Sequence, residues 1–152
     1  NGITCNCGVI QGGTVANAVP EFCTVIADIR YRTAQDLAAV EKRVSEIAET
    51  SYVEGTTCRL TLQSQRASME KTEANLRLFD TICKIFEENG LPIPTMGSAT
   101  GGSDAADMSS YGIPTVDSIG VYGKYIHSVR EYADIPSLAQ CAKRLASIIY
   151  CI

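Results

Sequence analysis

The sequence predicts a mixed fold of helices and strands, α+β in its first part and α/β in its second. Three observations lead to this prediction. Residues 22–31 and 56–65 alternate between apolar and polar positions, as half-buried strands do. Apolar residues recur every three to four positions in the segments 33–47, 72–90 and 134–148, as they do on amphipathic helices. In the second part, helical segments alternate with a short apolar strand.

The first part reads as strand, strand, helix, strand. Residues 3–11 and 22–31 are expected to pair as antiparallel strands around a glycine-containing loop. Thr33 is a good N-cap for the helix that follows, and that helix should lie on the sheet. Residues 56–65 are expected to form a third strand, which leaves one sheet edge in need of a partner. Its inward-facing residues would be Cys58, Leu60 and Leu62.

The second part begins after a polar stretch, residues 63–70, that looks like a domain boundary. Thr72 opens a helix that Gly90 ends. Ser103 or Asp104 is expected to cap a short helix. The apolar run 114–119 is predicted to be a buried parallel strand.

The charge of the chain argues against two classes of partner. The formal net charge is -4 and the isoelectric point is about 5.0. Nucleic acids and anionic membranes are bound by dense Lys and Arg on one face, and the sequence contains no such cluster. It also contains no run of about 18 apolar residues and no export signal, so no membrane span is expected.

The cysteines point to a reducing compartment. There are seven of them, an odd number, and none forms a CxxC motif. We therefore expect reduced core cysteines in a cytoplasmic protein. Cys5 and Cys7 would share one face of a strand, but two thiols without a second pair make a poor zinc site.

Most of the functional information lies between residues 99 and 127. This stretch reads ATGGSDAADMSSYGIPTVDSIGVYGKYIH and ends on the only histidine of the chain. A glycine loop, a helix N-terminus and one imidazole at a sheet edge could together form a site. Three motifs, GGTVANAVP before a strand ending in DIRY, TGGSDAADMSSYGIPTVDSIG, and GKYIHSVREYADI, follow one another along the chain. In order and spacing the chain resembles the zinc-dependent peptidase and acylase family, which includes glutamate carboxypeptidase, acetylornithine deacetylase and aminoacylase.

The resemblance covers nearly the whole chain and is strongest to the glutamate carboxypeptidase branch. It implies that residues 1–66 are part of a lid or dimerisation domain and that residues 67–152 are the C-terminal part of a catalytic domain. Family members are longer, and they carry a His-x-Asp pair and a Glu-Glu pair in an N-terminal catalytic segment. Those pairs supply most ligands of two zinc ions and the general base. The resemblance also implies a homodimer.

Seven residues match functional positions of the family. His127 matches the terminal zinc ligand, although a lone histidine judged by itself is more often a surface or capped residue. The other matches contact substrate: Asn17, Arg30, Arg66, Gly101, Gly102 and Ser103. Arg30 suits a substrate carboxylate, but Asp28 on the same strand face could simply pair with it. Asn17 could be a turn residue, and Gly101 to Ser103 could be a plain turn and N-cap.

The expected function is therefore part of a zinc metallohydrolase. It would cleave the amide bond of a peptide or N-acyl amino acid with a free carboxylate, and the chain alone should be inactive because most metal ligands are absent. One alternative is a non-catalytic dimerisation or interaction module. Another is a serine hydrolase, which would have to draw on a few polar residues without a G-x-S-x-G motif. These residues are Ser98 or Ser103, His127, and Asp104 or Asp117.

Overall fold

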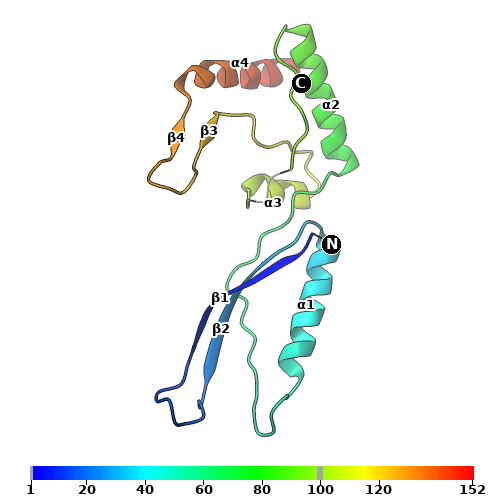
Figure 1. Cartoon of the computed structure of the whole chain (residues 1–152). Coiled ribbons are helices and arrows are strands. Elements are labelled where there is room, and N and C mark those ends of the chain that lie inside the picture. The colour runs from blue at the N-terminus through cyan, green and yellow to red at the C-terminus, as the bar shows by residue number, and fades with distance from the viewer. Residues whose placement is uncertain (1, 99–100) are drawn as a thin grey trace. The chain divides into compact units, whose positions relative to one another are not determined.

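A computed structural model describes residues 2–98 and 101–152 of the chain (Figure 1). The chain divides into two compact units, Asn1–Ser68 and Met69–Ile152. The α+β fold class predicted from the sequence is confirmed, because both units combine helices with a small antiparallel sheet. The assignment of the units to a lid domain and to a catalytic domain stays a prediction.

The first unit contains a long β-hairpin and one helix. Strand β1 (Thr4–Gly12) pairs antiparallel with β2 (Cys23–Arg30), and helix α1 (Ala34–Glu49) follows. Gly12 is needed where the strands meet the loop, since a Cβ there would lie 2.7 Å from the carbonyl oxygen of Phe22. Thr33 caps α1 as predicted, with its hydroxyl accepting from the Asp36 amide at 3.0 Å. The hairpin and the helix therefore follow the local sequence signals.

The predicted third strand is wrong. Residues 56–65 have no strand assignment, and Leu60 and Leu62 expose 53% and 70% of their surface instead of facing inward. Alternation is a property of the segment alone, whereas a strand also needs a neighbouring backbone to complete its hydrogen bonds. At the end of this segment, the Tyr31 hydroxyl donates to the Arg66 carbonyl.

The second unit is built around two long helices. Helices α2 (Glu73–Glu88) and α4 (Ile135–Cys151) enclose a small core, in which Ile82, Ile85 and Phe86 of α2 pack with Ile148 of α4. The short helix α3 (Asp104–Ser110) lies between them in sequence. Strands β3 (Gly123–Lys124) and β4 (Tyr132–Ala133) form a small antiparallel pair before α4 (Figure 1).

The predicted parallel strand at 114–119 is also wrong. This segment is irregular, and its half-buried residues Val116 and Ile119 pack against the core of α2 and α4. The apolar run was interpreted correctly as a core segment. Without a parallel neighbour among the described residues, however, its backbone forms no ladder. After this segment the backbone enters the short pair of β3 and β4, in which Gly123 is opposite Ala133 and Lys124 is opposite Tyr132.

The cysteines are free but most are not the core residues that were expected. Cys141 is buried and Cys83 is half-buried, where burial and then the nearby Asp80 charge raise the pKa of the Cys83 thiol. The other five, Cys5, Cys7, Cys23, Cys58 and Cys151, are exposed. The expectation failed because it assumed that every apolar face is covered, and in this chain several are not.

The uncovered surface is large. The chain exposes 12333 Å², whereas two self-contained domains of half its mass each would together expose roughly 9,000 Å². In the first unit no described residue is buried. None of the helices in the described parts is long and apolar enough to cross a bilayer.

Candidate functional site

His127 lies in the turn between β3 and β4, with its side chain exposed. Its backbone is left-handed, with φ 63°, and Tyr125 two residues earlier has φ 62°. Such angles cost a residue with a side chain of order 1–3 kcal/mol and are concentrated at functional sites. The turn is stabilised by its own hydrogen bonds, from Ser128 N to Tyr125 O at 3.1 Å and from Glu131 N to Ser128 O at 3.0 Å.

Glu131 fixes the backbone of His127 directly. The His127 N–H donates to Glu131 Oε2 at 3.2 Å, so the carboxylate reaches back across the turn. The Tyr125 ring makes two contacts within the same hairpin: the Arg130 guanidinium carbon is 4.8 Å from its centroid, and the Tyr132 ring centroid is 6.2 Å away. A cation over a ring face and a tilted ring pair are both favourable contacts. The imidazole therefore projects from a turn whose conformation its neighbours determine.

The glycine loop is described only from Gly101 onward, and the preceding positions 99 and 100 lie outside the described residues. Ser103 caps α3, as predicted, by accepting from the Ala105 amide at 3.2 Å. Gly101 and Gly102 are exposed. A Cβ at Gly101 would meet no described atom within 4 Å, so packing within this chain does not require glycine there.

Asn75, which belongs to none of the three sequence motifs, connects this region to α2. Its side chain is 7% exposed. Its amide nitrogen donates to Ser109 Oγ at 2.7 Å and to the Glu70 carbonyl at 3.0 Å, and its Oδ1 accepts from the Thr115 amide at 2.8 Å. The available signal was an amide on the apolar stripe of the helix, three residues before Leu78.

The three candidate residues of the first unit do not lie together at one site. Asn17 lies in the β1–β2 loop, and Arg30 ends β2 at the opposite end of the hairpin. The seven residue steps from Cys23 to Arg30 span about 23 Å of strand. Arg66 is close to the Arg30 end, since its carbonyl accepts from the hydroxyl of Tyr31.

Arg30 has the partner that the alternative interpretation suggested. Its Nε is 2.9 Å from Asp28 Oδ2, and both side chains are more than half exposed, at 61% and 63%. An exposed pair of this kind contributes about 0–1 kcal/mol, so a substrate carboxylate could displace Asp28 at small cost. The same geometry is compatible with a plain surface ion pair.

The chain supplies few metal ligands in one place. Within residues 2–98 and 101–152 no three His, Cys, Asp or Glu side chains come together as a possible metal site. The exposed His127 imidazole fits the chemistry of one zinc ligand, whereas a catalytic zinc takes about three from the protein.

The serine-hydrolase alternative finds no support in the described geometry. The Ser103 hydroxyl accepts the α3 cap hydrogen bond, and the His127 hydrogen bond runs from its backbone to Glu131. Asp117 Oδ1 accepts from the Ser118 amide at 2.5 Å. In the parts of the chain that the structure describes, these groups form no nucleophile–base pair.

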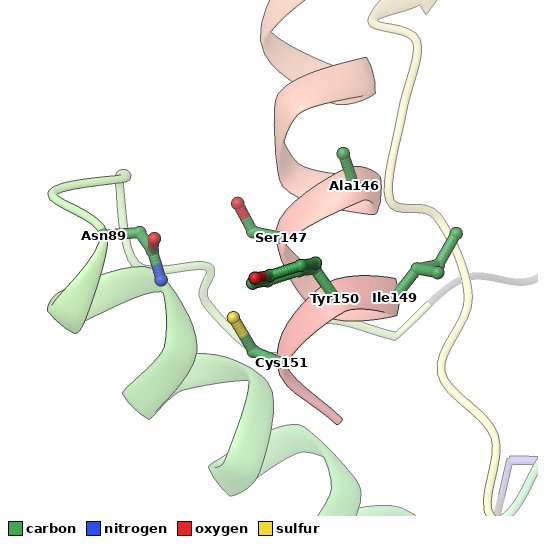
Figure 2. Close-up of a pocket in the computed structure, with 6 residues that line it drawn as sticks. All are labelled: Asn89, Ala146, Ser147, Ile149, Tyr150 and Cys151. Atoms are coloured by element: carbon green, nitrogen blue, oxygen red, sulfur yellow. The ribbon is translucent and has the colours of Figure 1, made fainter.

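An open depression of about 650 Å³ lies where the ends of α2 and α4 meet. Figure 2 shows Ser147 and Cys151 of α4 on the side toward Asn89, and Ile149 on the other side. None of the candidate residues lines it.

Comparison with known proteins assigns the class. Residues 1–56 match the family described as the M20 peptidase dimerisation domain. Similarity to two proteins named as peptidases extends over nearly the whole chain, so the match is not limited to these first residues. The family predicted from the three motifs is confirmed.

Individual relatives are similar at moderate identity. Carboxypeptidase G2 of Pseudomonas sp. (strain RS-16) is 27% identical over 145 residues, which cover 95% of this chain and 35% of that protein. Peptidase T of Clostridium novyi (strain NT) is 30% identical over 132 residues, which cover 86% of this chain and 31% of that protein. This chain thus spans about a third of the length of these relatives.

The fold comparison agrees. The crystal structure of the aminopeptidase PepT from Bacillus cereus ATCC 10987 superimposes with a TM-score of 0.74 at 24% identity, covering 97% of this chain and 39% of that structure. A tripeptidase from Staphylococcus aureus subsp. aureus Mu50 superimposes with a TM-score of 0.70 at 23% identity, covering 97% of this chain and 39% of that one. At these identities the likeness establishes the shared fold.

Proposed function

We propose that this chain is the C-terminal part of a zinc-dependent peptidase or N-acyl amino acid hydrolase. The observation that carries the proposal is the run of similarity. A dimerisation domain at residues 1–56 is followed by a second unit that stays similar to the same peptidases. The substrate would be a peptide or N-acyl amino acid with a free carboxylate. We place the protein in the cytoplasm on the basis of its cysteine usage.

In this proposal His127 is one zinc ligand. The exposed imidazole sits on a turn that Glu131 and Tyr125 hold in a left-handed conformation, which limits the positions the ring can take. Zinc, when bound, polarises the scissile carbonyl and lowers the pKa of a bound water. The remaining ligands and the general base come from a segment outside these 152 residues, so the chain alone is inactive.

In the first unit, Arg30 is the proposed contact for the substrate carboxylate. Arg30 can exchange its exposed partner Asp28 for a substrate carboxylate, and a guanidinium binds that group in a fork geometry. Arg66, near the same end of the hairpin, is proposed as a further contact. Asn17 is also proposed as a substrate contact, but at the opposite end of the hairpin it would be a separate one. The backbone of Gly101, Gly102 and Ser103 would line the pocket next to the zinc ligand.

The uncovered apolar surface supports a larger assembly. The chain exposes about 3,000 Å² more than two self-contained domains of half its mass each would expose. Helix α4 has one apolar face on α2 and a second one that is open, where Leu138 and Ile149 expose 60% and 72%. We propose that the missing catalytic segment covers this second face. A second copy would bind through residues 1–56, giving a homodimer.

The proposal is tested with the chain alone and with the complete protein. Amidase activity of the purified 152-residue chain with zinc or cobalt should be absent, and turnover that a chelator abolishes would overturn the inactivity. In the complete protein, His127→Ala should lower bound zinc, as measured by elemental analysis. Ser128→Ala, which alters the same turn without removing a ligand, is the matched control. Unchanged zinc content in His127→Ala would refute the ligand role.

A non-catalytic dimerisation module is the second candidate, and the extent of the family match favours it. That match covers residues 1–56 and leaves the second unit outside. Light scattering and metal analysis of the complete protein separate the two candidates. A dimer without bound metal and without amidase activity supports the module, whereas a dimer with zinc and activity supports the enzyme.

A further inference from the structure

Cys5 and Cys7 form a pair of exposed thiols that the proposed function does not use. Both lie on β1 with one residue between them, so their side chains leave the strand on the same face. Their cross-strand partners are Ile29 and Ala27, which bring no charged group to that face. Both thiols are free and both residues are exposed.

Residues that alternate on one face of a strand have Cα atoms roughly 6.6 Å apart, so two such thiols can reach one ion between them. Burial, the charge of Cys7 and a side-chain hydrogen bond with Cys7 raise the pKa of Cys5, and the Asp28 charge adds to the shift. The register of the strands changes directly after Cys7, between Cys7 and Val9, which places the pair at the end of the regular ladder.

The pair suits a soft ion of low coordination number. Zinc takes four ligands in structural sites, and the described residues offer no third or fourth ligand beside these two. Cu(I) is a soft d¹⁰ ion that prefers thiolates and is satisfied by two of them. We propose that Cys5 and Cys7 bind one Cu(I) ion between their sulfur atoms, independently of the peptidase function.

The binding step balances without a redox partner. Two S–H bonds break, two S–Cu bonds form and two protons leave to solvent. Copper remains Cu(I), and the bis-thiolate centre carries a net charge of -1. Because two protons are released, the affinity rises with pH across the range in which the thiols are protonated.

The test is an anaerobic titration of the reduced 152-residue chain with Cu(I) against a chromogenic Cu(I) chelator. The chain should take up Cu(I) at this pair, and Cys5→Ser or Cys7→Ser should each lower that affinity by about 100-fold or more, because a hydroxyl is a hard, weak ligand. Cys23→Ser and Cys58→Ser, which remove isolated exposed thiols, are the matched controls and should bind as the parent chain does. A Cys5→Ser, Cys7→Ser double variant that binds as tightly as the parent would overturn the proposal.

A second measurement does not depend on variants. Cu(I) should protect Cys5 and Cys7 from alkylation, as located by peptide mass spectrometry, while Cys23 continues to react. Zn²⁺ at the same concentration should leave all three reactive. Equal protection by Zn²⁺, or protection of Cys23 but not of the pair, would refute a two-thiol Cu(I) site.

Discussion

Replacing Asn75 should lower the unfolding free energy of the second unit by more than the small size of this side chain suggests. The side chain is 7% exposed and makes hydrogen bonds to Ser109, Glu70 and Thr115 at 2.7, 3.0 and 2.8 Å. Asn75→Ala removes these three hydrogen bonds. The Glu70 carbonyl keeps the Thr72 amide at 2.9 Å, whereas the Ser109 hydroxyl and the Thr115 amide lose the Asn75 side chain. Each buried unpaired group costs about 1–3 kcal/mol. Because water can reach some of them, we expect a total loss of about 2–4 kcal/mol in the free energy of unfolding.

Urea unfolding followed by circular dichroism measures this loss. The matched control is Asn89→Ala, since Asn89 is also an asparagine, at the C-cap of α2, but is exposed and makes one side-chain hydrogen bond, to the Ile85 carbonyl at 2.8 Å. The control should lose about 0.5–1 kcal/mol. Equal losses in the two variants would show that Asn75 is an ordinary helix residue and would refute its role as the connection between α2, α3 and the 113–116 segment.

Three further outcomes are expected. In the complete protein, Glu131→Ala should lower the zinc affinity about 10-fold, because the His127 amide loses its acceptor. Glu131→Gln should retain most of that affinity. Equal metal binding in the parent protein and both variants would refute the positioning role of Glu131. Gly120→Ala should destabilise the chain by about 1–3 kcal/mol in urea unfolding, since the new Cβ would overlap Cys141 Sγ, and Cys141→Ala should rescue part of that loss; no rescue would contradict the clash. Cys5 should be alkylated more slowly in the folded chain than in urea near pH 8.5, because its raised pKa leaves less thiolate. This difference in rate should shrink as the pH rises above the pKa of Cys5 in the folded chain. A rate difference independent of pH would refute the titration explanation.

The family was predictable from the sequence, whereas the backbone geometry around His127 was not. The motif around His127 pointed to the family from the sequence alone, and the family comparison agrees. The left-handed backbone of His127 and the Glu131 hydrogen bond that holds it could not be predicted from the motif. Both depend on how the turn between β3 and β4 closes, which is a property of the pair of strands.

The sequence by itself determined the local elements. Thr33 and Ser103 cap the helices they were expected to cap, because capping needs only groups within three residues of each other. The helix periods and the β1–β2 hairpin are equally local signals.

What only the tertiary structure decided depends on residues far apart in the chain. The segments 56–65 and 114–119 look like strands but lack a neighbouring backbone among the described residues, and Asn75 acquires its partners 34 and 40 residues away. Such pairings depend on which surfaces pack against each other, and the sequence of a single segment does not specify its partner.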